Sequence, residues 1–319
     1  MLAPLMGTTA HLVVVGAPGG DAAAEQAAYR RLLDLESRWT RFRHTSELAG
    51  LNANAGRPVV VSGDTYRVIE RAVHAWWLTG GRYDPTVHDA VVAAGYDRSF
   101  EQLAASGDDR PPVAAGVAPP ARPSPGCGEV TLCPTLPAVV VPEGVHLDLG
   151  GIGKGFAADL AASDLVAAGV QGACVNIGGD LRAEGSAPTD DGWIVAVEDP
   201  ADPARELCRI AISAGAVATS TSAKRRWTTA AGEAHHLIDP VTGQPARTDA
   251  VSVTVVAGEA WLAEVLAKAA FLAGVDEGLR LLDAAGVTGL VVTADGDVVR
   301  GPGMDVFAPL APPGVGGAA

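Results

Sequence analysis

A glycine-rich turn around one lysine is the stretch of this sequence best suited to hold a phosphate group. It reads Asp148-Leu-Gly-Gly-Ile-Gly-Lys-Gly-Phe-Ala-Ala-Asp159, and an apolar helical pattern follows it. Glycines that lead into a helix let the backbone approach a ligand closely and direct main-chain amides toward it. Lys154 adds a positive charge in the first turn of that helix. A tight strand-to-helix connection with an exposed lysine is the alternative interpretation.

Two common phosphate-binding motifs do not fit this turn. A P-loop has a glycine five positions before its Gly-Lys pair and a serine or threonine after it. Here those positions hold Asp148 and Gly155. The dinucleotide motif G-x-G-x-x-G begins at Gly151 and Gly153, but Phe156 stands where its third glycine belongs. The sequence therefore predicts neither a P-loop nucleotide hydrolase nor a dinucleotide-binding turn of this kind.

Further stretches place polar side chains beside turns: Asn176-Ile-Gly-Gly-Asp180, His235-His-Leu-Ile-Asp-Pro-Val-Thr-Gly243 and Gly80-Gly-Arg-Tyr-Asp-Pro-Thr86. A histidine suits the removal of a proton from a hydroxyl group near neutral pH. His235 and His236 could equally be structural residues. Asp239 before Pro240 could simply begin a turn, and Asp84 could cap the helix that follows.

Hydrophobic periodicity predicts the elements that must position these side chains. The predicted helices are Ala22–Trp39, Asp64–Thr79, Lys154–Ala168, Ala260–Leu272 and Val275–Ala285. The predicted strands are His11–Val15, Ala138–Val141, Cys174–Ile177, Trp193–Val197, Leu207–Ile212 and Val251–Val256. Asp64 or Ser62 could cap the second helix. Strands and helices do not alternate regularly, which favours an α+β fold with mixed sheets over a doubly wound fold.

The composition indicates an acidic globular protein and argues against some classes of partner. With 319 residues, the chain can form one large domain or two ordinary ones. The net charge of −14 argues against nucleic acid, because no basic cluster neutralises a phosphate backbone. No apolar stretch approaches the roughly 18 residues needed to span a bilayer, so direct membrane insertion is not expected.

Other segments bear on flexibility and compartment. Residues 107–128 are rich in Pro, Ala and Gly, which predicts a mobile surface insertion. Residues 309–319 are predicted to form a flexible tail. The N-terminus lacks the charged start and apolar run of a secretory signal, and the irregular spacing of the cysteines argues against a zinc site. Together these features predict a cytoplasmic, reduced protein.

The order and spacing of these motifs resemble one family, the FAD:protein FMN transferases or ApbE-type flavin transferases. The resemblance ends in the helix near Glu264 and therefore covers most of the chain. The segments that carry it are Met6-Gly-Thr8, Ser46-Glu-Leu-Ala-Gly-Leu-Asn52, Asp84-Pro-Thr86, Asp148–Asp159, Asn176–Asp180, Ala216-Val-Ala-Thr-Ser220 and His236–Gly243.

The resemblance implies both a fold and a reaction. The implied fold is a single two-lobed α+β domain over residues 1–319, with FAD bound between the lobes. The implied reaction is a magnesium-dependent transfer of FMN from FAD to a threonine of an acceptor protein, through a phosphodiester bond and with release of AMP. The acceptor would carry an Asp-x-x-Ser/Thr-x-Ala-Thr segment.

The resemblance also implies roles for particular residues. His236 matches the histidine suspected to be the base, and the main-chain carbonyl of Gly151 would contact the metal. The implied flavin contacts are Met6, Phe42, Arg82, Tyr83, Asp84, Asp148, Lys154 and Ile238.

The sequence departs from the family pattern in the late helix. The family completes its metal site with a run similar to Asp-Ala-x-Ala-Thr, whereas here Glu264 takes the aspartate position and Lys268 the threonine position. A protonated lysine cannot bind Mg²⁺. Glu264 and Lys268 could form an ordinary helix pair, Mg²⁺ could bind more weakly through Gly151 and Glu264, or the Lys268 ammonium could partly replace the metal ion.

Two smaller departures concern the expected ligand site. Thr221 replaces a glycine in a loop expected near the path of the nucleophile, and Phe42 replaces a more usual tyrosine. Two other functions remain open at this point. One is an FAD-binding protein without transfer activity, and the other is an FAD pyrophosphatase that releases FMN and AMP.

Overall fold

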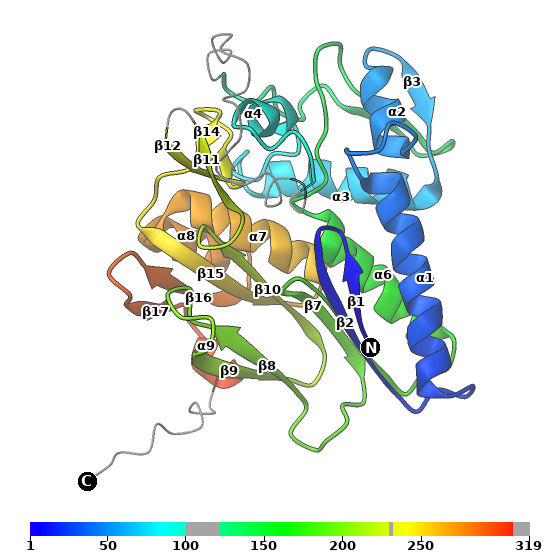
Figure 1. The fold of residues 1–319 in the computed structure, drawn as a ribbon, viewed down its shortest axis with the longest axis vertical. Coiled ribbons are helices and arrows are strands. Elements are labelled where there is room, and N and C mark those ends of the chain that lie inside the picture. Colours follow the sequence, from blue (N-terminus) through cyan, green and yellow to red (C-terminus); the bar gives the residue numbers. More distant parts are fainter. Residues whose placement is uncertain (100–101, 103–121, 230–231, 309–319) are drawn as a thin grey trace.

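An eight-stranded antiparallel sheet forms the centre of the molecule (Figure 1). The structure is a computed structural model that describes residues 1–99, 102, 122–229 and 232–308. The strands lie in the order β1-β2-β6-β7-β10-β15-β16-β17. In that order their bounds are Leu2–Leu5, Thr8–Val15, Gly172–Ile177, Asp180–Gly185, Gly215–Thr221, Ala250–Ala257, Thr288–Thr293 and Val298–Arg300.

Four long helices cover one face of this sheet (Figure 1). They are α1 (Asp21–Trp39), α6 (Gly153–Ala167), α7 (Ala260–Ala273) and α8 (Val275–Ala284). Helix α7 is buried on nearly every side because it lies between the sheet and its neighbouring helices. Asp159 of α6 accepts hydrogen bonds from the main-chain nitrogens of Ala260 (2.8 Å) and Trp261 (2.9 Å). It therefore caps the first turn of α7 and ties the two helices together.

The opposite face of the sheet is covered by a hairpin and a short helix. These are β8 (Trp193–Glu198), β9 (Glu206–Ile212) and α9 (Met304–Phe307). Trp193 and Ile210 pack with Met304 and with apolar side chains of the sheet in a second hydrophobic core. Because the sheet is buried on both faces, strands such as β15 have almost continuous apolar sequences.

The remaining elements gather at one end of the sheet, at the top of Figure 1. They include α2 (Glu47–Ala53), α3 (Gly63–Leu78) and α4 (His88–Ala93). The serine before α3, Ser62, accepts a hydrogen bond from the main-chain nitrogen of Thr65 and caps that helix. Small ladders are formed by β3 (Pro58–Val60), β4 (Thr131–Cys133), β5 (Ala138–Val140), β11 (Arg226–Thr229), β12 (Gly232–His235), β13 (Ile238–Asp239) and β14 (Gln244–Pro245).

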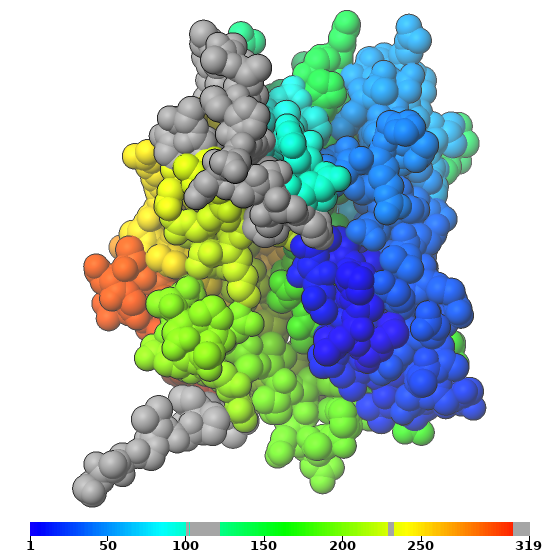
Figure 2. Space-filling model, viewed as in Figure 1, coloured from blue at the N-terminus to red at the C-terminus, as the bar shows by residue number. Residues whose placement is uncertain are grey.

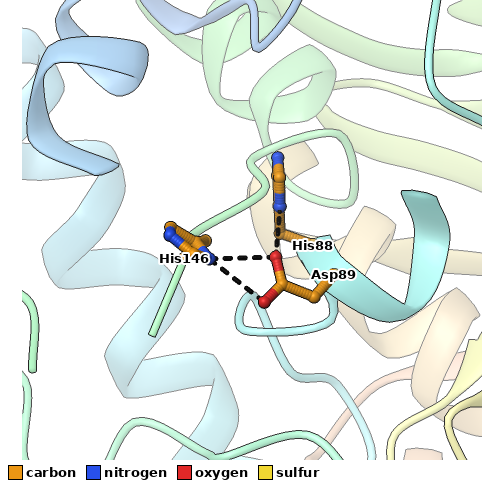
Figure 3. Close-up of side chains that lie close together, drawn as sticks. All are labelled: His88, Asp89 and His146. Carbon is orange, nitrogen blue, oxygen red and sulfur yellow. Dashed lines mark hydrogen bonds and ion pairs between the residues drawn. The ribbon is translucent and has the colours of Figure 1, made fainter. Parts of the chain in front are cut away.

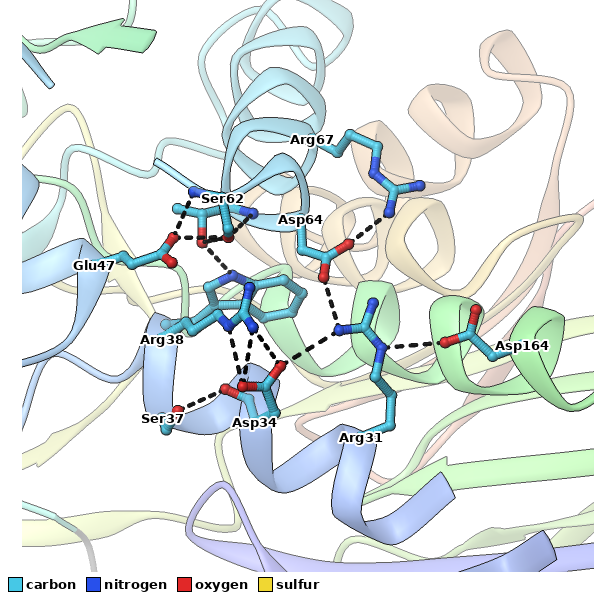
Figure 4. Close-up of polar contacts among 11 residues, drawn as sticks. Arg31, Asp34, Ser37, Arg38, Glu47, Ser62, Asp64, Arg67 and Asp164 are labelled. Atoms are coloured by element: carbon cyan, nitrogen blue, oxygen red, sulfur yellow. Dashed lines mark hydrogen bonds and ion pairs between the residues drawn. The ribbon is translucent and has the colours of Figure 1, made fainter. Parts of the chain in front are cut away.

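A network of polar contacts fixes α1 against α3 and α6 (Figure 4). The Arg31 guanidinium lies 2.7 Å from the carboxylate of Asp64 in α3 and 3.1 Å from that of Asp164 in α6. Trp39, at the end of α1, donates a hydrogen bond to the Thr65 hydroxyl (3.1 Å). Burial raises the pKa of the Asp64 carboxyl, but the hydrogen bond from Arg31 helps to outweigh that effect, and the net result is a lowered pKa.

The α+β class is confirmed, and the predicted helices and strands are present within one or two residues at most ends, although β2 begins three residues earlier than expected. The sheets differ from the expectation, because every strand pairing in the described residues is antiparallel rather than mixed. Strands β1, β7, β10, β16 and β17 of the central sheet were not predicted. Strand β7 was missed because its Asp, Ala, Glu and Gly residues have low strand propensity. No helix among the described residues is long and apolar enough to cross a membrane.

The expected insertion at 107–128 lies partly outside the described residues, and the expected tail at 309–319 lies wholly outside them. The end of the insertion, residues 122–128, packs onto the molecule. The main-chain nitrogen of Gly126 donates to the Thr86 hydroxyl (2.9 Å), and Cys127 is buried. These contacts hold Gly126 and Cys127 against the rest of the molecule, and the mobility of the insertion stays a prediction.

Candidate active site

A cavity of about 500 Å³ lies where the N-terminal hairpin, α6, α7 and the segments around α4 and β13 meet. In Figure 2 the blue N-terminal segments form one side of this face of the molecule, and green and yellow-green segments form the other. Of the site residues expected from the sequence, all but Glu264 line the cavity. They are Met6, Phe42, Arg82, Tyr83, Asp84, Asp148, Gly151, Lys154, His236, Ile238 and Lys268.

The tip of the β1–β2 hairpin forms one wall of the cavity. Leu5 pairs with Thr8, so Met6 and Gly7 make a two-residue turn in which both have positive φ angles, of 49° and 67°. A turn of this kind matches the twist of the strands and requires such angles. The side chain of Arg225, which also lines the cavity, donates to the main-chain oxygen of Gly7 (3.2 Å).

The glycine turn holds fewer open main-chain donors than the sequence suggested. The nitrogen of Gly150 donates to the Asp148 carboxylate (2.7 Å), and the nitrogens of Ile152 and Gly153 donate to the carbonyl of Leu149. Asp148 also forms an ion pair with Arg41 (3.0 Å). Asp148 therefore stabilises the turn and positions a cation, while most of the turn's amides already have internal partners.

Lys154 does not project freely into the cavity, because two buried carboxylates hold its ammonium. It forms ion pairs with Asp180, at the start of β7, and with Glu264 of α7 (2.5 Å). Burial alone would lower the pKa of Lys154, but the charges of Asp180 and Glu264 raise it. Burial raises the pKa of Asp180 to about 6. The other Glu264 oxygen accepts a hydrogen bond from the nitrogen of Gly155 (2.8 Å).

Lys268 has a different environment from Lys154. It lies one turn beyond Glu264 on α7, but no carboxylate among the described residues lies within ion-pair distance of its ammonium, and none of those residues accepts a hydrogen bond from it. The helix pair considered for Glu264 and Lys268 is therefore wrong. A methyl group at Gly151 would lie only 2.7 Å from Lys268 Nζ, so the ammonium sits directly on the glycine turn. Burial lowers the pKa of Lys268.

His236 and Tyr83 each direct a buried polar atom that has no hydrogen-bond partner among the described residues. These atoms are the Nδ1 nitrogen of His236 and the hydroxyl of Tyr83. Burial, and then the charge of Arg225, hold the pKa of His236 well below its usual value of 6.5. Burial raises the pKa of Tyr83 well above 10. Both side chains line the cavity in their neutral forms.

Two acidic residues of the expected site order turns, and the alternative that Asp84 caps the following helix is wrong. Asp84 is buried and accepts hydrogen bonds from the main-chain nitrogen (2.8 Å) and hydroxyl (2.6 Å) of Thr86. It therefore orders the turn before α4, and no side chain caps that helix. Asp239 accepts from the nitrogen of Val241 (2.9 Å), as expected for an Asp-Pro turn.

Aromatic and cationic side chains form the remaining wall. Phe42 is 42% exposed, and the Arg41 guanidinium stacks 4.3 Å from its ring centroid. The ring of Tyr96 is 5.9 Å from that of Phe42. Three residues that line the cavity were not predicted from the sequence: Arg41, Tyr96 and Arg225. Arg41 lies next to Phe42, which was the one available signal, whereas the other two stand in stretches without a recognisable motif.

The expected loop around Thr221 is wrong. Thr221 is the last residue of strand β10 and pairs with Ser252 of β15. Its hydroxyl donates a hydrogen bond to the main-chain oxygen of Val251 (3.0 Å). The β-branched threonine fits this extended position, where the glycine of the family pattern would favour a loop.

The side chains at the expected magnesium position do not fit Mg²⁺. This ion prefers oxygen ligands in near-octahedral geometry. The chain offers the Gly151 carbonyl and the Glu264 carboxylate, but both Glu264 oxygens already accept hydrogen bonds. The third position is the Lys268 ammonium, which has no lone pair to donate when protonated.

A separate group of potential metal ligands lies on the surface (Figure 3). Ligand atoms of His88, Asp89 and His146, one from each residue, lie within 4.8 Å of one another, and the Nδ1 nitrogens of His88 and His146 contact Asp89. Asp89 Oδ1 is 2.8 Å from the first nitrogen and 2.9 Å from the second. Imidazole-rich sets suit zinc rather than magnesium, so this group does not supply the expected magnesium site.

The fold and cavity define an α+β ligand-binding protein whose site combines aromatic rings with several cations. The chain belongs to the ApbE family, because the model of that family matches residues 6–293. An FAD:protein FMN transferase of Vibrio cholerae is 27% identical over 312 residues, which cover 96% of this chain and 91% of the relative. The enzyme of the same name from Treponema pallidum is 31% identical over 274 residues, covering 79% and 72%.

Solved structures support the same assignment. The crystal structure of the ApbE protein from Thermotoga maritima matches with a TM-score of 0.82 and 26% identity, covering 96% of this chain and 98% of the other. The flavin transferase ApbE from Vibrio cholerae matches with a TM-score of 0.78 and 26% identity over the same shares.

Proposed function

We propose that this protein is an FAD:protein FMN transferase, with FAD as its substrate and a threonine of an acceptor protein as the nucleophile. Membership of the ApbE family and the names of its relatives support this function. The observation that carries it to this chain is the cavity, in which nearly all the residues implied by the family resemblance converge from distant segments. We further propose that residues 1–319 act as one domain.

The proposed reaction moves a phosphoryl group between two oxygen atoms. The threonine oxygen forms a bond to the phosphorus on the FMN side of the FAD diphosphate. The bond from that phosphorus to the bridging oxygen breaks, and AMP leaves with that oxygen. The threonine proton passes to a base. Positioning and charge stabilisation supply most of the catalysis in reactions of this type.

His236 is the base in this proposal. Its imidazole lines the cavity and its lowered pKa keeps it neutral, so it can accept a proton across the physiological pH range. The neighbouring cations that lower this pKa, Arg225 foremost, also favour the negatively charged diphosphate. The same cations therefore attract the diphosphate and lower the pKa of the base.

Different side chains of the cavity suit the flavin ring and the diphosphate of the ligand. Phe42 offers an exposed aromatic face for the flavin ring to stack on. Met6, Arg82, Tyr83, Asp84 and Ile238 are the other proposed flavin contacts. The glycine turn with Lys154 and Lys268 is the proposed position of the diphosphate, as the cations there would offset its charge.

A labelling assay tests this function. The protein is mixed with FAD and an acceptor domain that carries an Asp-x-x-Ser/Thr-x-Ala-Thr segment, and the denatured acceptor is examined for flavin fluorescence. We expect labelled acceptor and one AMP per label. Free FMN and AMP without label would support an FAD pyrophosphatase, and intact bound FAD would support a binding protein without transfer activity. A matched acceptor with alanine in place of the target threonine is the control.

We also propose a cytoplasmic location. The supporting observation is that Cys127, Cys133, Cys174 and Cys208 are all free thiols, which is typical of proteins from reducing compartments.

A further inference from the structure

We propose that the Lys268 ammonium takes the place of a divalent cation beside the diphosphate of FAD, so that this protein binds FAD and transfers FMN without Mg²⁺. This inference rests on the proposed function and specifies how the same site holds its substrate. Lys154 and Lys268 both line the cavity, but they differ in the partners of their ammonium groups.

The charges of the two lysines are balanced differently. Asp180 and Glu264 both pair with Lys154, so the three groups together leave one negative charge that is buried beside the cavity. Lys268 has no acidic partner within ion-pair distance in the described part of the chain, and its positive charge balances that excess only from a distance. Its three N–H donors are therefore available to a ligand.

The Lys268 ammonium lies beside the glycine turn. Lys268 Nζ lies against Gly151, the residue whose carbonyl the family resemblance assigns to the metal. The ring of Tyr83 approaches the same glycine, since a methyl group there would lie 3.0 Å from the ring edge. Lys268 and Tyr83 therefore both lie against the glycine implied to contact the metal, and both line the cavity.

An ammonium group is suited to bind a diphosphate. A lysine ammonium can donate several hydrogen bonds to phosphate oxygens and carries a full positive charge. Such a charge would stabilise the bound diphosphate and the negative charge that develops on the bridging oxygen as AMP leaves. The surrounding oxygen donors do not fit Mg²⁺, because Glu264 is already occupied by Lys154 and Gly155.

The first test compares FAD binding and acceptor labelling by the unaltered protein in EDTA and in millimolar Mg²⁺. We expect the FAD dissociation constant and the labelling rate to be the same in both. If FAD binding or labelling requires added Mg²⁺, the inference is wrong while the transferase function stands. If FAD binds equally in both conditions but no acceptor is labelled in either, the proposed function fails and the binding role of Lys268 is still tested as follows.

The second test replaces the ammonium. Lys268→Met is expected to weaken FAD binding by roughly 10- to 100-fold, the range for the loss of charged hydrogen bonds. Riboflavin, which has no phosphate, should bind equally to Lys268→Met and to the unaltered protein, which shows that the cavity is intact. Lys268→Arg should retain most of the FAD affinity.

Lys224→Met is the matched control, because Lys224 is the remaining lysine of the chain and pairs with Glu198 on the surface. It should bind FAD like the unaltered protein. Equal FAD affinity of Lys268→Met and the unaltered protein would overturn the inference. So would an equal loss of riboflavin and FAD affinity, since that result would indicate a structural role.

Discussion

The proposed base, His236, is buried beside several cations, and both burial and these charges lower its pKa. Its Nδ1 atom is buried and has no hydrogen-bond partner among the described residues, and the charges of Arg225 and Lys268 oppose protonation of the ring. A histidine in water would lose half of its basic form near pH 6.5. Here the protonated form is disfavoured both by burial and by like charge.

The labelling rate should therefore remain constant as the pH falls from 8 through 6.5. The pKa of His236 lies well below 6.5 in the folded protein, so the neutral base persists below the pH at which an ordinary histidine becomes protonated. The measurement is kcat/KM for the acceptor as a function of pH at saturating FAD. A fall in rate centred at pH 6.5 or above would contradict this.

His236→Ala should lower labelling by at least about 100-fold, because general bases contribute factors of 10²–10⁴. FAD affinity should change little, as an uncharged ring is lost from one wall of the cavity. Labelling kinetics and FAD binding, measured on the same preparation, separate the two effects. The control is His44→Ala, which removes a histidine that does not line the cavity. Normal labelling by His236→Ala would mean that another group takes the proton.

At the scale of the elements, the junction of α6 and α7 determines the geometry of the site. Gly155 lies where the two helices touch, and its nitrogen holds Glu264 in place. A methyl group at Gly155 would lie 2.4 Å from the carbonyl oxygen of Ala260, which is main chain and cannot move aside easily. At Gly153 the nearest atoms would be 3.8 Å away, in ordinary contact.

Gly155→Ala should therefore destabilise the protein by about 1–3 kcal/mol, the usual cost of overpacking, and should weaken FAD binding by moving Glu264 and Lys154. Gly153→Ala is the matched control. It adds the same methyl group in the first turn of the same helix, where alanine is a better helix former than glycine, and should leave stability unchanged or slightly raised. Urea unfolding of the two variants checks this, and equal stabilities would refute the packing argument.

At the scale of the whole molecule, the cavity joins parts of the chain that are far apart in sequence, from Met6 to Leu272. FAD bound there would link the N-terminal hairpin, helices α6 and α7 on one face of the sheet, and the segments around α4 and β13. A ligand that binds only the folded state adds about 2.7 kcal/mol of stability at one hundred times its dissociation constant.

FAD should accordingly raise the unfolding temperature in one cooperative transition, with the shift growing as the logarithm of its concentration. Differential scanning calorimetry with and without FAD measures this effect. AMP alone, at the same concentration, should give a smaller shift because it lacks the flavin. If saturating FAD left the unfolding temperature unchanged, binding between these parts would be refuted.

The long helices, several strands and the motifs that line the cavity could be predicted from the sequence. Helices such as α3 and α8 carry strong periodic patterns, and the Asp239-Pro240 turn depends on residues whose own backbone preferences select the conformation. Strand β7 lacked that information, because its Asp, Ala, Glu and Gly residues have low strand propensity and become extended only through pairing with β6 and β10.

The partners of the charged side chains in the cavity could be determined only from the tertiary structure. Along the chain, Asp180 lies 26 residues from Lys154 and Glu264 lies 110 residues from it. No local sequence pattern predicts that both carboxylates form ion pairs with Lys154. The spacing of Glu264 and Lys268 suggested a helix pair, but the helix junction at Gly155 turns Glu264 toward α6 instead. Ion pairs depend on distance through space, which the sequence does not contain, and this choice leaves Lys268 open to the cavity.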